Sequence, residues 1–296
     1  MNSQSPARSY LVFLLVLVAA MLFAAITSPW VGALLSSVPL HRVFSRLMLL
    51  GMIAGTGCLI LRYRGRRELL GFNGPWPRFL QYALRGLLGG FALMALALIP
   101  LMLLDVREWN DHVPSEFRGW LALAMKGLGT GLAVALIEET LFRGAMQGAL
   151  QRLGARGWAV FAVPLLYSAM HFLGGAASVP GNEVNAWSGF VVWQGFFNSF
   201  AEPLRILDAF VALYFVGVLL ALARQRWGDI AGCIGLHAGF VTAITVFRKI
   251  SVPTSENAWS FLVGSFDGLL GIWIAALTAL VCVIFWRTAG SKPGAI

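Results

Sequence analysis

Two adjacent glutamates and an arginine stand in an apolar run that is long enough to cross a bilayer. Glu138 and Glu139 follow the apolar residues 131–137, and Arg143 comes four residues after Glu139. A charged residue at the centre of a membrane helix costs about 2.5–3.5 kcal/mol on the insertion scale. Such residues are kept where they are paired, face a wet cavity or perform chemistry. We therefore predict a functional site here.

Two histidines, His171 and His237, also lie within apolar runs. Their depth in the membrane can be compared with that of Glu138 by counting 1.5 Å per residue from the nearest basic loop residue. The depths are ~21 Å for Glu138, ~22 Å for His171 and ~16 Å for His237. Because the three basic loops are predicted to lie on one side of the membrane, the sequence predicts that these side chains share one site.

The spacing of the two glutamates separates their roles. Glu139 and Arg143 have the i,i+4 spacing of an ion pair on one helix face, whereas Glu138 points about 100° away. A carboxylate in a water-poor cavity can act as a general base that activates water. Histidines can orient that water or donate hydrogen bonds to an oxyanion. The chemistry that these residues make available is the activation of a water molecule by a carboxylate.

Other interpretations use the same residues. A Glu and two His side chains from three helices could hold zinc with one open position, but a metal-free mechanism is preferred and no cofactor is predicted. Glu139 and Arg143 could instead be an ion pair that locks the bundle. A non-catalytic membrane scaffold, an immunity factor or a transporter would use these charges for packing or ligand binding.

The composition places the chain in a lipid bilayer. Of its 296 residues, 58% are hydrophobic and 12% are charged, against about 25% charged residues in a typical soluble domain. The net charge of +9 comes from short basic clusters between apolar runs. Such clusters are typical of cytoplasmic loops and do not indicate a nucleic-acid partner. The predicted fold is an all-α, polytopic transmembrane helical bundle.

About eight transmembrane helices are predicted, because each needs about 20 mostly apolar residues. The candidate spans are 10–26, 43–61, 80–104, 121–150, 158–173, 206–223, 229–247 and 268–286. Basic residues follow the second, fourth, sixth and eighth spans, whereas acidic residues dominate the loops after the third and fifth. The positive-inside rule then places both termini in the cytoplasm. We interpret the chain as a multi-pass protein of a bacterial plasma (inner) membrane.

The stretch 174–203 is too interrupted by glycine and proline to span the bilayer. Its aromatic part, 190–200, predicts a helix that lies at the membrane interface. Two interpretations stay open for this stretch: a connecting loop with an interfacial anchor, or a flap over a substrate cavity.

Three segments resemble the motifs of a known family. They are Glu138-Glu139-Thr-Leu-Phe-Arg143-Gly144, Tyr167-x-x-x-His171 and His237-x-x-x-Val241. The first resembles the Glu-Glu-x-x-x-Arg motif of the CAAX-protease and bacteriocin-processing (CPBP, Abi) family of intramembrane proteases. The second resembles that family's Phe-x-x-x-His motif with Tyr for Phe. The third resembles its His-x-x-x-Asn motif with Val for Asn.

This resemblance implies an intramembrane endopeptidase that hydrolyses a membrane-tethered or membrane-spanning peptide with glutamate-activated water. On that pattern Glu138 is the base, and Glu139 and Arg143 shape the site. His171 and His237 position the water or stabilise the oxyanion.

The resemblance covers about 121–247, which is taken as the catalytic transmembrane core. Residues 1–120 are then N-terminal transmembrane helices of unassigned role, and 248–296 form the last helix and a cytoplasmic tail. Val241 departs from the pattern, because valine offers no side-chain hydrogen bond. Either an oxyanion donor is missing, or Asn198 or Thr242 replaces it.

Overall fold

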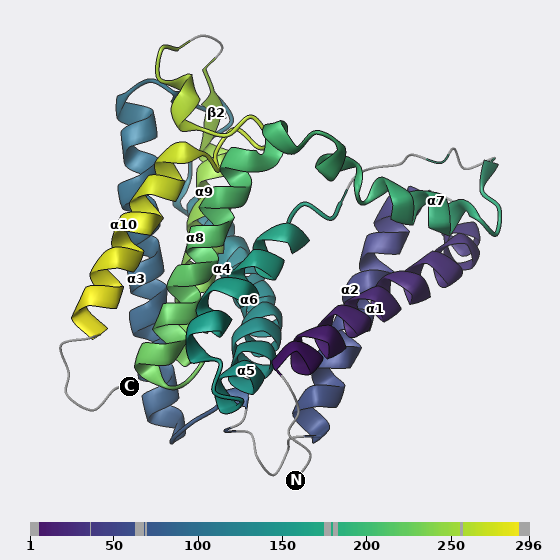
Figure 1. The fold of residues 1–296 in the computed structure, drawn as a ribbon. Coiled ribbons are helices and arrows are strands. Elements are labelled where there is room, and N and C mark those ends of the chain that lie inside the picture. Colours follow the sequence, from purple (N-terminus) through teal and green to yellow (C-terminus); the bar gives the residue numbers. More distant parts are fainter. Residues whose placement is uncertain are drawn as a thin grey trace.

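The structure, a computed structural model, describes residues 6–35, 37–62, 68, 70–174, 179, 183–254 and 257–289. Over these residues it consists of helices and a short two-stranded sheet (Figure 1). The elements are α1 (Pro6–Leu34), α2 (Leu40–Arg62), α3 (Trp76–Leu103), β1 (Arg107–Trp109), α4 (Phe117–Glu139), η2 (Thr140–Gln147), α5 (Gly148–Arg152), α6 (Arg156–Met170), α7 (Ser188–Gly195), η4 (Asn198–Ala201), α8 (Pro203–Trp227), α9 (Ala231–Ile250), β2 (Ser251–Pro253), η5 (Ser260–Leu262) and α10 (Ile272–Ala289). Some residues behind the loop predictions lie outside the described residues. They are the basic Arg64, Arg66, Arg67 and Lys292, which follow the second and eighth predicted spans, and Pro180 and Gly181 of the stretch 174–203.

The predicted helical membrane bundle is confirmed. Among the described residues, five helical stretches are long and apolar enough to cross a membrane. They are Leu14–Leu34, Trp76–Leu103, Phe117–Arg152, Pro203–Trp227 and Ala231–Ile250. Each of the eight predicted spans overlaps a helix, and the span 121–150 runs over α4, η2 and α5. Crossing by α2, α6 and the shorter apolar α10 stays a prediction.

Helix α9 lies at the centre of the larger part of the bundle. It packs against α3 and α4, while α8 packs against α6 and α10 (Figure 1). Buried apolar residues of α3, α8, α9 and α10 form the largest core cluster, which includes Leu98, Leu219 and Phe240. Helices α1 and α2 pack against each other and, with α7, make a second group beside this core (Figure 1).

The helix ends at one end of the bundle carry basic residues. The Gln225 side chain at the end of α8 donates to the Arg156 carbonyl at the start of α6, at 3.2 Å. The guanidinium of Arg226 lies 5.4 Å from the ring centre of Phe285 near the end of α10. At the opposite end β1 and β2 pair as antiparallel strands (Figure 1). The start of α6 and the ends of α8 and α10 therefore lie together at one end of the molecule.

Glycines allow α9 to approach α3 closely. A Cβ added to Gly235 on α9 would lie 1.9 Å from the Ala83 carbonyl oxygen on α3. A Cβ added to Gly90 on α3 would lie 2.3 Å from the Leu236 carbonyl oxygen on α9. Small residues at such crossings are typical of membrane helices, where packing rather than hydrophobic burial drives association. This contact fixes the helix that carries His237.

Replacing Gly235 by Ala is expected to destabilise the bundle by about 1–3 kcal/mol, because the new methyl group overpacks a backbone contact. The matched control is Gly129→Ala on α4, where an added Cβ meets nothing within 4 Å. Both variants gain the same helix propensity. Thermal unfolding in one detergent should therefore separate them, and equal unfolding midpoints would contradict the close crossing.

The aromatic stretch 190–200 is only partly helical. α7 ends at Gly195, and a short 3₁₀ turn, η4, follows. Val192 and Phe196 are buried, and the Phe196 ring lies 4.6 Å from that of Phe44 on α2. The stretch therefore packs on the α1–α2 pair, and its role as an interfacial anchor or a flap stays a prediction.

Candidate functional site

The two glutamates lie where helix α4 changes its winding. α4 ends at Glu139, and the next eight residues form the π-helix η2 before α5 begins. π-helical turns are rare and occur frequently at functional sites. Every residue of η2 is buried, so its polar side chains depend on partners inside the bundle.

Glu139 and Arg143 form a fully buried ion pair. Arg143 Nη1 lies 3.1 Å from Glu139 Oε1, and both side chains are 0% exposed. Arg143 Nη2 donates to the Gly217 carbonyl on α8 at 3.1 Å. The guanidinium also lies 4.4 Å from the ring centre of Tyr167 on α6. The pair therefore ties η2 to two neighbouring helices.

His237 stands between the two carboxylates. Its Nδ1 lies 2.7 Å from Glu139 Oε1 and donates to it, because a carboxylate only accepts. Its Nε2 faces Glu138 Oε2 at 3.9 Å. This second distance is too long for a direct hydrogen bond. Glu139 thus fixes the orientation of the imidazole, and Nε2 is left facing Glu138.

His171 lies at the edge of this group. It is exposed, and its Nδ1 donates to the Tyr167 carbonyl at 2.8 Å. Its ring centre lies 4.6 Å from that of Tyr167, which is itself 6.1 Å from the ring of His237. The structure therefore brings Glu138, Glu139 and His237 into direct proximity, with His171 reached through Tyr167.

The zinc alternative has no ligand set in the part of the chain that the structure describes, where no three His, Cys, Asp or Glu side chains are placed to hold a metal ion. His237 also has one ring nitrogen committed to Glu139. What the cluster offers is a carboxylate, Glu138, and an imidazole, His237, that a buried ion pair holds in place.

Sequence reasoning missed Gln147 as part of the site. It is 0% exposed, and its side-chain nitrogen donates to the Ala221 carbonyl on α8 at 2.9 Å. Arg143 makes the same kind of bond to Gly217 one turn earlier, so the two side chains hold η2 against α8 at successive turns. The sequence does contain one indication of this role: Gln147 is a polar residue in an apolar run, four positions after Arg143 and so on the same helix face.

Neither suggested replacement for the missing asparagine reaches the cluster through a described hydrogen bond. Val241 lies one turn after His237 and so on the same face of α9. The Thr242 hydroxyl donates to the Ala238 carbonyl at 2.6 Å, and its side chain packs against Gly131 on α4. Asn198 is exposed in η4. Thr242 is thus committed elsewhere, and its suggested role is not supported.

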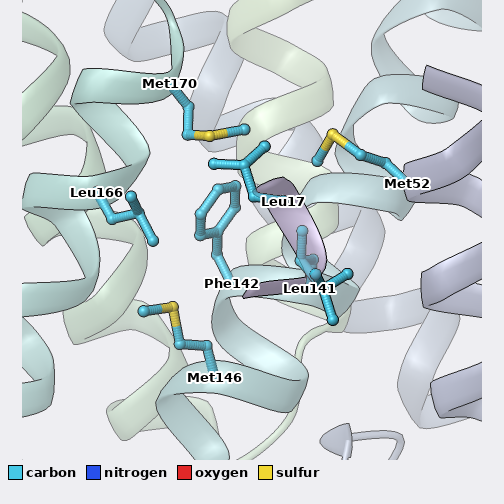
Figure 2. Close-up of a pocket in the computed structure, with 8 residues that line it drawn as sticks. Leu17, Met52, Leu141, Phe142, Met146, Leu166 and Met170 are labelled. Atoms are coloured by element: carbon cyan, nitrogen blue, oxygen red, sulfur yellow. The ribbon is translucent and has the colours of Figure 1, made fainter. Parts of the chain in front are cut away.

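An apolar pocket lies beside the motif of η2. Leu141 and Phe142 of the motif form part of its wall (Figure 2). The remaining lining residues come from α1, α2, η2 and α6: Val16, Leu17, Met52, Met146, Leu166 and Met170. The wall of this pocket is apolar, and three of its eight lining residues are methionines, whose side chains are flexible.

Comparison with known proteins identifies one family. Residues 119–243 match the family model described as Type II CAAX prenyl endopeptidase Rce1-like. All three motif segments lie inside the matched range. No curated protein and no solved structure matches the chain.

Proposed function

We propose that this chain, whose residues 119–243 belong to the Type II CAAX prenyl endopeptidase Rce1-like family, uses Glu138 to activate the water that hydrolyses a peptide bond. The observation that carries the proposal is the facing pair of Glu138 Oε2 and His237 Nε2, 3.9 Å apart. Glu138 Oε2 is enclosed and has no hydrogen-bond partner among the described residues. Two polar atoms at this separation can both hydrogen-bond one oxygen placed beside them.

The proposed reaction forms no covalent bond between the enzyme and the substrate. Glu138 takes a proton from the water as its oxygen bonds to the carbonyl carbon of the substrate, which converts the carbonyl oxygen into an oxyanion. Protonated His237 donates from Nε2 to that oxyanion. When the intermediate collapses, the C–N bond breaks and Glu138 returns the proton to the departing amine. The products are a carboxylic acid and an amine.

Glu139 and Arg143 act through His237 rather than on the substrate. Glu139 accepts from His237 Nδ1, which fixes the ring, and Arg143 balances the charge of Glu139. His171, with Nδ1 held by the Tyr167 carbonyl, directs Nε2 toward the attacking water in this proposal. In this proposal, each of the five predicted site residues (Glu138, Glu139, Arg143, His171 and His237) has its own role.

We assign the catalytic core to residues 121–247, with 1–120 as preceding transmembrane helices and 248–296 as the last helix and tail. The substrate is a membrane-associated protein or peptide. The family description favours a prenylated C-terminal peptide, while peptide precursors and sorting tails remain further candidates. Both termini are assigned to the cytoplasm of a bacterial inner membrane from the distribution of basic loops.

The test uses purified protein in lipid nanodiscs and three internally quenched peptides. The first ends in a farnesylated CAAX sequence, the second is the same peptide without the farnesyl group, and the third spans the bilayer. We expect cleavage of a probe, with one ¹⁸O atom from labelled water in the new carboxylate. His171→Ala should lower kcat by about 10²-fold, because the water loses its orienting group. No cleavage of any probe by the wild-type protein would reject the proposal.

A non-catalytic scaffold is a second candidate, and Val241 is the residue that favours it, because it removes a hydrogen-bond donor beside His237. On this hypothesis the cluster only stabilises the bundle. It requires that loss of the Glu138 carboxylate leaves the biological role intact, while disruption of the Glu139–Arg143 pair lowers the unfolding temperature.

A further inference from the structure

Tyr167 lies within the polar cluster, in ring contact with His171, His237 and Arg143. The side chain is 2% exposed, and no described residue hydrogen-bonds the hydroxyl. The hydroxyl is also not among the fully enclosed polar atoms of the bundle, unlike Thr140 Oγ1 and Arg143 Nε. The side chain is thus buried while its hydroxyl is not sealed off, so the hydroxyl can donate to a group that enters the cluster.

The ring of Tyr167 is held rigidly from several sides. Phe142 packs edge-on against it with ring centres 5.5 Å apart, and the Arg143 guanidinium lies 4.4 Å from the ring centre. Gly217 lets α8 come close, since a Cβ there would lie 3.1 Å from Tyr167 Cδ1. A donor on such a fixed ring is preorganised and loses little entropy when it binds.

The hydroxyl shares its surroundings with the reacting groups. Tyr167 lies among the charged side chains of the cluster, with its ring centre 4.4 Å from the Arg143 guanidinium, which is itself paired with Glu139. The ring of His237 lies 6.1 Å away, almost perpendicular to the tyrosine ring. The Tyr167 ring therefore lies next to the imidazole that faces Glu138.

A tetrahedral oxyanion is commonly held by two hydrogen-bond donors. His237 Nε2 supplies one in the proposed mechanism, and Val241, on the same face of α9, supplies none. The sequence has a hydroxyl at the position where the resembled motif has phenylalanine, and it lacks the amide where that motif has asparagine. The two departures from the motifs are complementary: Val241 in place of asparagine removes a hydrogen-bond donor, and Tyr167 in place of phenylalanine adds one.

We propose that the Tyr167 hydroxyl donates a hydrogen bond to the oxyanion and fills the role that Val241 cannot. The inference rests on the proposed hydrolysis at Glu138. It makes Tyr167 a catalytic residue, since the hydroxyl touches the reacting carbonyl oxygen, and it explains how the site retains two donors.

The experiment measures kcat and KM of Tyr167→Phe with the farnesylated quenched peptide in nanodiscs. We expect kcat to fall about 10²-fold, the loss caused by removal of one oxyanion donor, with KM and the unfolding temperature unchanged. The double variant Tyr167→Phe/Val241→Asn should recover about tenfold or more of kcat, because asparagine restores a donor. Tyr214→Phe on α8 serves as the matched control and should keep the wild-type rate.

Three results would overturn the inference. They are a rate for Tyr167→Phe within about twofold of wild type, a loss that follows a lower unfolding temperature, and a loss that Val241→Asn fails to restore. Failure of the underlying hydrolase proposal is distinguishable, because the wild-type protein itself would then leave the probe uncleaved.

Discussion

Glu138→Gln is expected to lower kcat for peptide hydrolysis by about 10²–10⁴-fold, which is the usual contribution of general acid–base catalysis. The amide is close in size to the carboxylate but cannot accept the proton of the attacking water. The unfolding temperature should stay unchanged, because the Glu138 side chain is 25% exposed and its Oε2 has no hydrogen-bond partner among the described residues. Initial rates with the farnesylated quenched peptide in nanodiscs measure the effect.

Two further variants separate proton transfer from charge. Glu138→Asp keeps the carboxylate but withdraws it by one methylene, so it should retain more activity than the glutamine variant. Glu202→Gln removes an exposed carboxylate near the start of α8 and should leave the rate unchanged. If Glu138→Gln cleaves the probe at the wild-type rate, the base assignment fails. The non-catalytic alternative would then be favoured.

Part of the site could be predicted because it is encoded locally. The i,i+4 spacing of Glu139 and Arg143 predicts an ion pair, and the structure has that pair fully buried. The count of residues from the basic loops predicts that His237 lies at a membrane depth similar to that of Glu138. In the structure the His237 ring lies 2.7 Å from Glu139 Oε1 and 3.9 Å from Glu138 Oε2. The sequence could not reveal that His237 is held by Glu139, because the two are far apart in the chain and meet only through the packing of α9 on α4.

The π-helix η2 is not predictable from the sequence, because the intrinsic helix propensities of residues 140–147 do not distinguish a π-helix from an α-helix. What accompanies this segment in the structure is a set of hydrogen bonds to another helix. Arg143 and Gln147 donate hydrogen bonds to backbone carbonyls of α8. The residue spacing within 140–147 does not indicate that α8 is the helix that accepts them. The same limit applies to α7, whose aromatic composition suggested the membrane interface but whose buried face packs on α1 and α2. The length of an apolar run predicts where in the sequence a helix lies. Which helices pack against each other depends on contacts between distant residues, such as that of Gly235 on α9 with Ala83 on α3.

Arg143→Ala is expected to destabilise the bundle by about 3–5 kcal/mol, because it leaves the Glu139 carboxylate buried without its cation. The substitution also removes the bond to the Gly217 carbonyl and the contact with the Tyr167 ring. Arg143→Lys should fall between wild type and alanine, since lysine keeps the charge but lacks the fork that serves two acceptors at once. Thermal unfolding of the purified protein in one detergent compares the three chains.

The matched control for this prediction is the exposed pair of Arg205 and Glu202. Their charged atoms lie 3.4 Å apart with side chains 65% and 68% exposed, so Arg205→Ala should cost less than about 1 kcal/mol. The double variant Glu139→Gln/Arg143→Met should be more stable than Arg143→Met alone, because it leaves no unpaired buried charge. If the buried and exposed arginine variants unfold at the same temperature, Arg143 has no structural role, and its placement must be explained by catalysis alone.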